Sequence, residues 1–398
     1  MKILMLVQFQ SSTRGGGEVM FNQLAHELAN RGHEIHVIKH RMLSSNERDI
    51  NISNSERVIF YDIFPPVEHK GGLPATVIHN LLYVLNAVRH GVKIVRKRSV
   101  NLIHANSYSP ILAGWLISKI TKRPMLVTIH DVGSIHGMIF WERWMKQFGR
   151  LSILKALIGY AFELLSIKLS RNIHTVSETS KKDILQIGFK NKNIYVISNS
   201  LDLRLYPGND NVEYENEIVF IGRLVFYKNL EVVLKALKYM SSQDVKLTVI
   251  GDGPMKKHWQ KLAEDLEITD KVEFKGYVPH EEKIKILRRA SALVLPSLFE
   301  GFGIVILEAW AYKKPVIVSN TPPLNQIVEH GKDGIIVDLF KTEEWAKYIS
   351  LLINNKELAK ELGLNGYSKL IKNYNIVNWA TRFEKLYYDV ASSFYIKN

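Results

Sequence analysis

Short apolar runs recur along the first half of the chain, and helical segments separate most of them. Lys2–Val7 predicts a buried strand, and Gly17–Arg31 repeats apolar residues with the spacing of one helix face before Gly32 ends it. Strands that alternate with helices are typical of a parallel sheet covered on both faces. Further strands of this half are predicted at Glu34–Ile38, Leu102–His104, Met125–His130, Asn172–Val176 and Ile194–Ile197.

The alternation starts again after a polar break, Leu205–Asn216, which contains Pro207 and Gly208 and is predicted to be a linker. New strands are predicted at Ile218–Ile221, Lys246–Ile250, Val272–Lys275, Ala292–Leu295, Pro315–Ser319 and Ile335–Val337. The predicted fold class is therefore α/β, with two Rossmann-like doubly wound domains facing across a cleft. Such domains bind ligands at the carboxyl ends of their strands.

The predicted domains are residues 1–203 and residues 204–376. The last helix, Val377–Phe394, is amphipathic and rich in aromatic residues, so residues 377–398 are expected to pack back on the first domain.

Length and composition agree with two globular domains, because the chain has 398 residues and 46% hydrophobic residues. It has no cysteine, which excludes disulfides, thiolate metal sites and a cysteine nucleophile. The apolar N-terminus leads directly into a glycine-rich loop and is better explained as a strand than as a signal peptide. The apolar stretch Leu151–Ile167 contains Lys155 and Glu163, so it is a poor membrane span.

Positive charge is concentrated in the first half of the chain. Residues 1–200 hold 26 Lys and Arg against 13 Asp and Glu, out of a formal net charge of +14 for the whole protein. This half is expected to face an anionic partner, such as phospholipid, a lipid-linked phosphate or nucleic acid. A generally basic proteome, or chance, is the alternative.

Two motifs of the first half follow predicted strands. Arg14–Glu18 contains three glycines and opens a helix, so its backbone can approach a ligand and the helix N-terminus favours negative charge. A tight turn is the alternative interpretation of this stretch, which is not the dinucleotide fingerprint. Thr128–Asp131 places His130 at the carboxyl end of a strand, where the side chain can face a cleft or be satisfied by the loop backbone.

Two more motifs follow strands of the second half. Gly222–Asn229 carries Arg223 and Lys228, and two cations on one strand-to-helix loop suit a diphosphate. Such groups can stabilise a departing diphosphate without a metal. Two solvated surface cations are the alternative interpretation. Gly251–Pro254 predicts a turn after a strand, with a structural role or with its backbone near a nucleotide as the two interpretations.

Pro296–Ala309 is the most informative stretch of the chain. A strand ends in a loop with Gly301 and Gly303, and a helix begins near Ile304, so backbone amides and a helix N-terminus form an anion site. Glu300 lies in the loop, and Glu308 lies on an otherwise apolar helix, where an acid needs a partner. A carboxylate accepts hydrogen bonds well from the paired hydroxyls of a ribose or a hexose. No D-x-D motif occurs, so a divalent-metal site on a diphosphate has no support from the sequence.

In this order, the motifs resemble those of the retaining glycosyltransferases of the two-Rossmann GT-B type, family four. The resemblance covers almost the whole chain, includes Asn199–Asp202, and is most specific at the spaced pair Glu300 and Glu308. Two stretches depart from the pattern of the family: Asn199-Ser200 stands where Asn-Gly is common, and Thr321–Gln326 stands where Gly-Gly-x-Pro-Glu is common.

The resemblance implies a role for each matching residue. Arg223 and Lys228, next to Gly222, would hold the donor diphosphate and stabilise it as it leaves. Glu300 would bind the transferred sugar, with the amides of Gly301, Phe302 and Gly303 nearby, and Glu308 would bind the ribose. His130 would contact the donor sugar, and Gly16 and Gly17 would lie near the diphosphate and the acceptor. The implied co-substrate is a nucleotide sugar such as a UDP- or GDP-hexose, with no cofactor and no metal.

The implied acceptor is a glycan or a lipid-linked precursor of a cell-surface glycan. Basic residues alternate with apolar and aromatic ones at residues 81–98 and 141–150, which suits a membrane interface or else ordinary solvated helices. The expected location is cytoplasmic, with peripheral attachment to the cytoplasmic membrane face as an option.

Three alternatives remain open. Another two-Rossmann sugar-nucleotide enzyme, such as an epimerase, would share the fold. A nucleic-acid-binding protein would use the basic half, but it leaves the glycine loops and the acid pair unexplained. An inactive family member that serves as a binding partner would not need the intact set of His130, Arg223, Lys228, Glu300 and Glu308.

Overall fold

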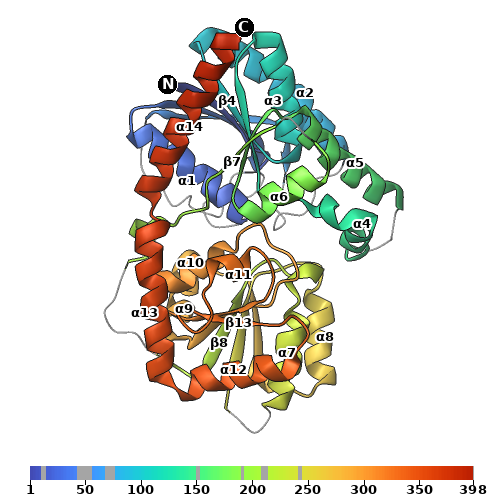
Figure 1. Ribbon diagram of the computed structural model, residues 1–398. Helices are drawn as coiled ribbons and strands as arrows, with labels where there is room; N and C mark the ends of the chain where they lie inside the picture. The colour runs from blue at the N-terminus through green and yellow to red at the C-terminus, as the bar shows by residue number, and fades with distance from the viewer. Residues whose placement is uncertain are drawn as a thin grey trace. The chain divides into compact units, whose positions relative to one another are not determined.

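The computed structural model of the protein describes residues 1–9, 15–42, 56–67, 77–148, 153–189, 192–207, 214–240 and 244–397 (Figure 1). The chain forms two compact units. The first contains Met1–Glu142, Ser152–Asn199 and Ile376–Asn398, and the second contains Arg143–Leu151 and Ser200–Asn375. The chain therefore leaves the first unit after Asn199 and returns to it at Ile376.

The first unit contains a seven-stranded sheet in the order β3-β2-β1-β4-β5-β6-β7, and every neighbouring pair is parallel. Helices cover both faces of a parallel sheet, so its central strands are buried, as in β4, whereas the edge strands β3 and β7 are partly exposed. The strands are β1 (Lys2–Leu6), β2 (Glu34–Met42), β3 (Val58–Val67), β4 (Leu102–Asn106), β5 (Met125–Ile129), β6 (Asn172–Thr175) and β7 (Asn193–Val196).

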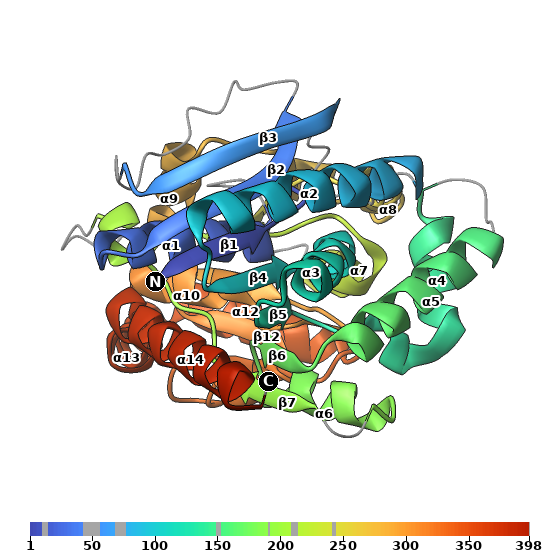
Figure 2. The ribbon, with the colours of Figure 1, turned by 90° about the horizontal axis from the view of Figure 1, so that it is seen from above.

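Helices of the first unit lie in groups around this sheet (Figure 2). Helix α3 packs against both α2 and α5, and α1 packs against α14. The helices of this unit are α1 (Gly16–Asn30), α2 (Val77–Arg98), α3 (Tyr108–Thr121), α5 (Ile153–Leu169), α6 (Glu178–Gln186) and α14 (Ile376–Lys397). Helix α4 (Gly137–Lys146) begins in the first unit, and its residues from Arg143 onward belong to the second. A short 3-10 helix, η1 (Gly133–His136), follows β5.

The second unit repeats the plan with six parallel strands in the order β10-β9-β8-β11-β12-β13. The strands are β8 (Glu217–Ile221), β9 (Lys246–Ile250), β10 (Val272–Gly276), β11 (Ala292–Leu295), β12 (Val316–Ser319) and β13 (Ile335–Val337). The helices are α7 (Leu230–Tyr239), α8 (Lys256–Asp265), α9 (His280–Arg289), α10 (Ile304–Ala311), α11 (Leu324–Ile327), α12 (Thr342–Asn354) and α13 (Lys356–Asn373), with 3-10 turns η2 (Leu203–Leu205), η3 (Phe226–Lys228) and η4 (Thr269–Lys271).

Each unit has its own apolar core. The core of the first unit includes Leu4, Ile103 and Val127 from central strands, and that of the second includes Phe220, Val249 and Val294. The predicted pair of doubly wound α/β domains is therefore confirmed. Among the described residues, no helix is long and apolar enough to cross a membrane.

The core of the first unit also contains a row of hydrogen-bonded histidines. Thr128 Oγ1 lies 2.7 Å from His104 Nε2 and 3.0 Å from His174 Nδ1, and His104 Nδ1 lies 2.7 Å from the Tyr387 hydroxyl of α14. Burial lowers the pKa of His174 to about 3 and holds the pKa of His104 well below its usual value. Both imidazoles are therefore neutral, and α14 is part of the polar network of the core.

One strand differs from the sequence prediction. Strand β3 was not predicted, because Pro65, Pro66 and Asp62 are unusual in a strand. It is paired only with β2, so it is the edge of the sheet, where a missing backbone N–H is tolerated. The other predicted strands are present, with ends that shift by a few residues.

Candidate functional site

Both sheets reverse their strand order at one place, between β1 and β4 in the first unit and between β8 and β11 in the second. Loops that leave neighbouring strands in opposite directions open a crevice at this point, beyond the carboxyl ends of the strands. Three of the predicted motifs follow strands at these points: Gly15–Gly17 after β1, Gly222–Asn229 after β8 and Pro296–Gly303 after β11. His130 follows β5, the strand next to β4.

The loops after β8 and β11 are joined in the second unit. The Leu298 amide donates to the Tyr227 carbonyl oxygen at 2.7 Å, and the Tyr227 and Phe299 rings meet edge to face. Lys228 Nζ forms an ion pair with Glu300 Oε1. The Ser297 hydroxyl also donates to Glu300 Oε1, at 2.8 Å. The predicted cation and acid therefore lie together, and Ser297 fixes the carboxylate.

The turn after β9 lies against the loop after β8. The Gly222 amide donates to the Ile250 carbonyl oxygen at 3.0 Å. Gly251 has a φ of 128°, and a Cβ at this position would lie 2.0 Å from the Gly222 carbonyl oxygen. Only glycine allows this approach, which holds Gly222 and the neighbouring Arg223 at the carboxyl edge of the sheet. The Arg223 side chain is half-buried and has interaction partners within the protein.

The loop after β11 ends at the N-terminus of α10. Gly303 precedes this helix with a φ of 90°. The neighbouring Phe302 is buried, so its side chain packs inside the protein. Amides in the first turn of a helix have no acceptor inside the helix and carry a partial positive charge. Gly301, Phe302 and Gly303 therefore lead into a position suited to an anion or a hydroxyl oxygen.

Glu308 is buried in the second turn of α10 and has two donors. Its Oε1 accepts from the Tyr206 hydroxyl at 2.6 Å and from Lys283 Nζ at 2.7 Å. Burial would raise the pKa of Glu308, but the charge of Lys283 and the two hydrogen bonds outweigh it, so this pKa lies below its usual value. The carboxylate is therefore ionised, and Oε2 remains available to accept hydrogen bonds from a ligand.

His130, Gly16 and Gly17 lie together in the first unit. His130 Nε2 lies 2.8 Å from Asn106 Oδ1, at the end of β4. A Cβ on Gly17 would lie 2.8 Å from the same nitrogen, so the start of α1 passes directly over the ring. Gly16 is the first residue of that helix. Burial lowers the pKa of His130 to about 4, which makes the imidazole a neutral hydrogen-bonding group at neutral pH.

A buried acid fixes the loop that follows His130. Glu163 of α5 accepts from the Gly133 amide at 3.2 Å, from the Ser134 amide at 2.6 Å and from the Tyr108 hydroxyl at 2.9 Å. Burial raises the pKa of Glu163 to about 7 despite these donors. A small pocket beside the acid is lined by Ser107, Tyr108, Ile111, Ile129, His130, Asp131, Glu163, Ser166 and Ile167.

The predicted site residues thus form two groups, one in each unit. Gly222, Arg223, Lys228, Glu300–Gly303 and Glu308 surround the reversal point of the second sheet, while Gly16, Gly17 and His130 lie beside that of the first. The sequence did not reveal Tyr206, Lys283 or Asn106. The apolar residues around Glu308 indicated that this acid has a partner. They did not indicate which residue is the partner, because Tyr206 and Lys283 lie far away in the sequence. Among the described residues, no group of three His, Asp or Glu is arranged to hold a metal ion.

The two-unit architecture matches solved structures over nearly the whole chain. Sucrose-phosphate synthase from Thermosynechococcus elongatus aligns with a TM-score of 0.78 and 19% identity, covering 98% of this chain and 99% of that chain. The Anabaena protein HepE in complex with UDP-glucose aligns with a TM-score of 0.73 and 19% identity, covering 97% and 99%. These structures define the fold as that of the GT-B glycosyltransferases.

Sequence profiles place the chain within this class. Residues 14–205 match the profile described as Glycosyltransferase Family 4, and residues 207–369 match the profile described as Glycosyl transferases group 1. The chain belongs to this family of glycosyltransferases, as the motifs predicted.

Curated glycosyltransferases also align with most of the chain. N-acetyl-alpha-D-glucosaminyl L-malate synthase from Bacillus anthracis is 24% identical over 94% of both chains. An uncharacterized glycosyltransferase of Methanocaldococcus jannaschii is 26% identical over 85% of both chains.

Proposed function

We propose that the protein is a retaining glycosyltransferase that moves a hexose-type sugar from a nucleotide sugar to a glycan or lipid-linked acceptor, without a metal. The observation that carries the proposal is the arrangement around α10. A buried, ionised Glu308 and an ion-paired Glu300 flank a helix N-terminus at the reversal point of a doubly wound sheet. Acids for hydroxyls and amides for an anion are the two kinds of group that a nucleotide sugar needs.

The donor contacts follow from the chemistry of each group. Glu308 Oε2 accepts from the ribose hydroxyls while Tyr206 and Lys283 hold Oε1. Arg223, Lys228 and the amides that lead into α10 bind the diphosphate, because fixed donors and cations stabilise the charge of the leaving group. Glu300 accepts from the hydroxyls of the transferred sugar. The complexes of HepE with UDP and UDP-glucose support a uridine nucleotide as the first donor to test.

The reaction breaks the bond between the anomeric carbon and the diphosphate oxygen and forms one between that carbon and an acceptor oxygen. The acceptor proton passes to the leaving phosphate, so no protein base is required. His130, neutral and fixed by Asn106, is proposed to contact the donor sugar, with Gly16 and Gly17 near the diphosphate and the acceptor. The asymmetric positive charge of the chain supports an anionic or lipid-linked acceptor and a cytoplasmic site at the membrane face.

Nucleotide binding to the second unit is the first test. Thermal shift is measured with UDP, GDP, ADP and their hexose conjugates, with and without chelator, because a ligand of the folded state raises the apparent melting temperature. We expect one nucleotide to stabilise the protein equally in both buffers. Glu308→Gln keeps an acceptor for Tyr206 and should weaken that nucleotide about tenfold to a hundredfold.

Glu329→Gln is the matched control, since this acid is exposed in the same unit and forms an ion pair with Lys332. Equal nucleotide affinity of Glu308→Gln and wild type would refute the ribose assignment. Loss of stabilisation in chelator would refute metal independence. Stereochemistry is then checked by NMR of the glycoside formed with the preferred donor, and an inverted anomeric carbon would refute the retaining mechanism.

A further inference from the structure

We propose that the layer formed by α2, α3 and α5 of the first unit docks on an anionic lipid bilayer. The inference deepens the proposed function, because it names the surface that would bring the enzyme to a lipid-linked acceptor. Neighbouring helices form this layer: α3 packs against α2 and against α5 (Figures 1 and 2).

The charge of this layer has one sign. Helices α2, α3 and α5 have 22, 14 and 17 residues, and their only acid is Glu163, which is buried and occupied by backbone amides. The basic residues of the three helices are Arg89, Lys93, Arg96, Lys97, Arg98, Lys119, Lys155 and Lys168.

The basic residues of α2 are free of carboxylate partners within the described part of the chain. The pKa of His90 on the same helix is lowered by partial burial and by the charges of Arg89 and Lys93. The local field is therefore positive, which suits an anionic surface.

Apolar residues on two of these helices, α2 and α5, are also exposed to solvent. On α2, Ile78, Leu81 and Leu85 follow each other at helical spacing and are 68%, 57% and 67% exposed. The same stripe continues into Arg89 and Lys93. On α5, Ile153, Leu154, Leu157, Ile158 and Leu165 are exposed, with Leu154 at 66%. Exposed apolar residues beside cations on the same helix are the pattern of an interfacial amphipathic helix.

Other helices of the protein have the ordinary surface of a solvated protein. On α7 and α8, Lys235 and Lys261 pair with acids three or four residues away on the same helix. On α14, Glu384 and Asp389 alternate with Arg382 and Lys385. The absence of exposed acids is thus a property of the α2–α3–α5 layer and not of all helices. A bilayer fits this face better than a second copy of the chain, because two copies would bring two cationic surfaces together.

The test is cosedimentation of the full chain with vesicles of phosphatidylcholine, with and without phosphatidylglycerol, at low and high salt. We expect binding only to the anionic vesicles, weakened by salt. Each cation near such a surface contributes about fivefold to partitioning, so Lys93→Glu combined with Arg96→Glu should reduce binding at least about thirtyfold.

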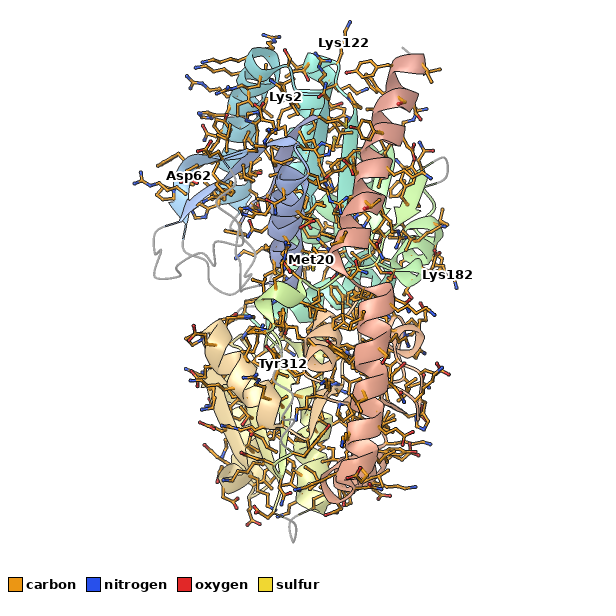
Figure 3. All side chains as sticks on the ribbon, turned by 90° about the vertical axis from the view of Figure 1, so that its left-hand side faces the viewer. Lys2, Met20, Asp62, Lys122, Lys182 and Tyr312 are labelled. Atoms are coloured by element: carbon orange, nitrogen blue, oxygen red, sulfur yellow. The ribbon has the colours of Figure 1, made fainter. Side chains whose placement is uncertain are left out.

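A matched control separates surface from net charge. Lys182→Glu with Lys385→Glu changes the net charge equally, but Lys182 projects from α6 and Lys385 lies on α14 (Figure 3). This control should bind like wild type. Leu154→Ser with Leu157→Ser should reduce binding about tenfold, whereas Leu364→Ser with Ile371→Ser, which are exposed on α13, should not.

The proposal would be overturned if both charge variants lost vesicle binding equally, or if wild type bound neutral vesicles as well as anionic ones. It would also be overturned if wild type bound neither kind of vesicle. Self-association of wild type that Leu154→Ser with Leu157→Ser abolishes, without vesicle binding, would assign the face to a second copy instead. The nucleotide thermal shift of these variants should equal that of wild type. Failure of docking is therefore distinguishable from failure of the donor site.

Discussion

Glu308 and Glu163 are both buried carboxylates on helices, but their surroundings shift their pKa values in opposite directions. Lys283 contributes a full positive charge beside Glu308 and holds its pKa below the usual value. Glu163 has neutral donors only, and burial raises its pKa to about 7. The presence of one cation therefore decides whether the buried acid is ionised throughout the physiological range.

Glu163→Gln should change how stability depends on pH. The folded state holds the Glu163 proton up to about pH 7, whereas the unfolded chain releases it near the ordinary value of 4.5. Between these values the folded state binds more protons, so this group lowers the free energy of unfolding as pH rises. Chemical unfolding of wild type and Glu163→Gln at several pH values should show the variant gaining stability relative to wild type from pH 5 to pH 8.

Glu178→Gln is the control, because Glu178 is an exposed acid on α6. The difference in unfolding free energy between Glu178→Gln and wild type should be the same at pH 5 and at pH 8. A constant difference between Glu163→Gln and wild type would contradict the assignment of the raised pKa to Glu163.

At the scale of elements, the sequence predicted most strands because a buried parallel strand is a short apolar run with turn residues at its ends. Strand β3 was missed because its prolines are compatible with a strand only at a sheet edge, and edge position is a property of the whole sheet. The partners of Glu308 were missed for the same kind of reason. Tyr206 lies 102 residues away, and the register of α9 on the sheet is what brings Lys283 to Oε1.

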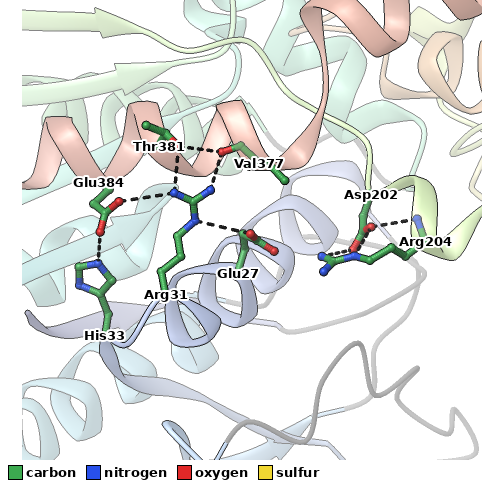
Figure 4. Close-up of polar contacts among 8 residues, drawn as sticks. All are labelled: Glu27, Arg31, His33, Asp202, Arg204, Val377, Thr381 and Glu384. Carbon is green, nitrogen blue, oxygen red and sulfur yellow. Dashed lines mark hydrogen bonds and ion pairs between the residues drawn. The ribbon is translucent and has the colours of Figure 1, made fainter.

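Helix α14 is attached to α1 by polar contacts as well as by its aromatic face (Figure 4). Arg31 donates to the Thr381 hydroxyl at 2.9 Å and to the Val377 carbonyl oxygen at 2.7 Å. Glu384 pairs with Arg31 and lies 2.7 Å from His33 Nε2. In the second unit, Arg204 and Asp202 form a separate ion pair, drawn in the same figure.

Glu384→Ala should weaken the attachment of α14. The acid is partly exposed, so solvent screening limits the loss of unfolding free energy of the first unit to about 1 kcal/mol. Lys385 is a neighbouring exposed residue, and Lys385→Ala should leave the unfolding free energy almost unchanged. Hydrogen exchange of α14 amides is the measurement, and equal exchange in both variants would show that aromatic packing alone holds the helix.

At the scale of the whole molecule, the two units should differ in their response to acid. Burial lowers the pKa values of His40, His130 and His174 to about 4 or below. All three residues lie in the first unit. The unfolded chain binds protons at these groups below the ordinary value of 6.5, whereas the folded unit does not. The free energy of unfolding of the first unit therefore falls as pH drops from about 6.5 towards 4.

Hydrogen exchange at pH 7 and at pH 5, corrected for the intrinsic exchange rate, should show loss of protection in β4, β5 and β6 before β8, β9 and β11. Addition of the preferred nucleotide should raise protection in the second unit at either pH. Simultaneous loss in both sheets would mean that the units unfold as one body.

The return of the chain to the first unit at Ile376 affects the order in which the protein can be made. The buried Phe383 and Tyr387 of α14 complete a core whose other members are synthesised before residue 200. During translation the second unit has all its strands available while the first still lacks a helix that it needs. The basic first unit should therefore reach its final structure last, after α14 has left the ribosome.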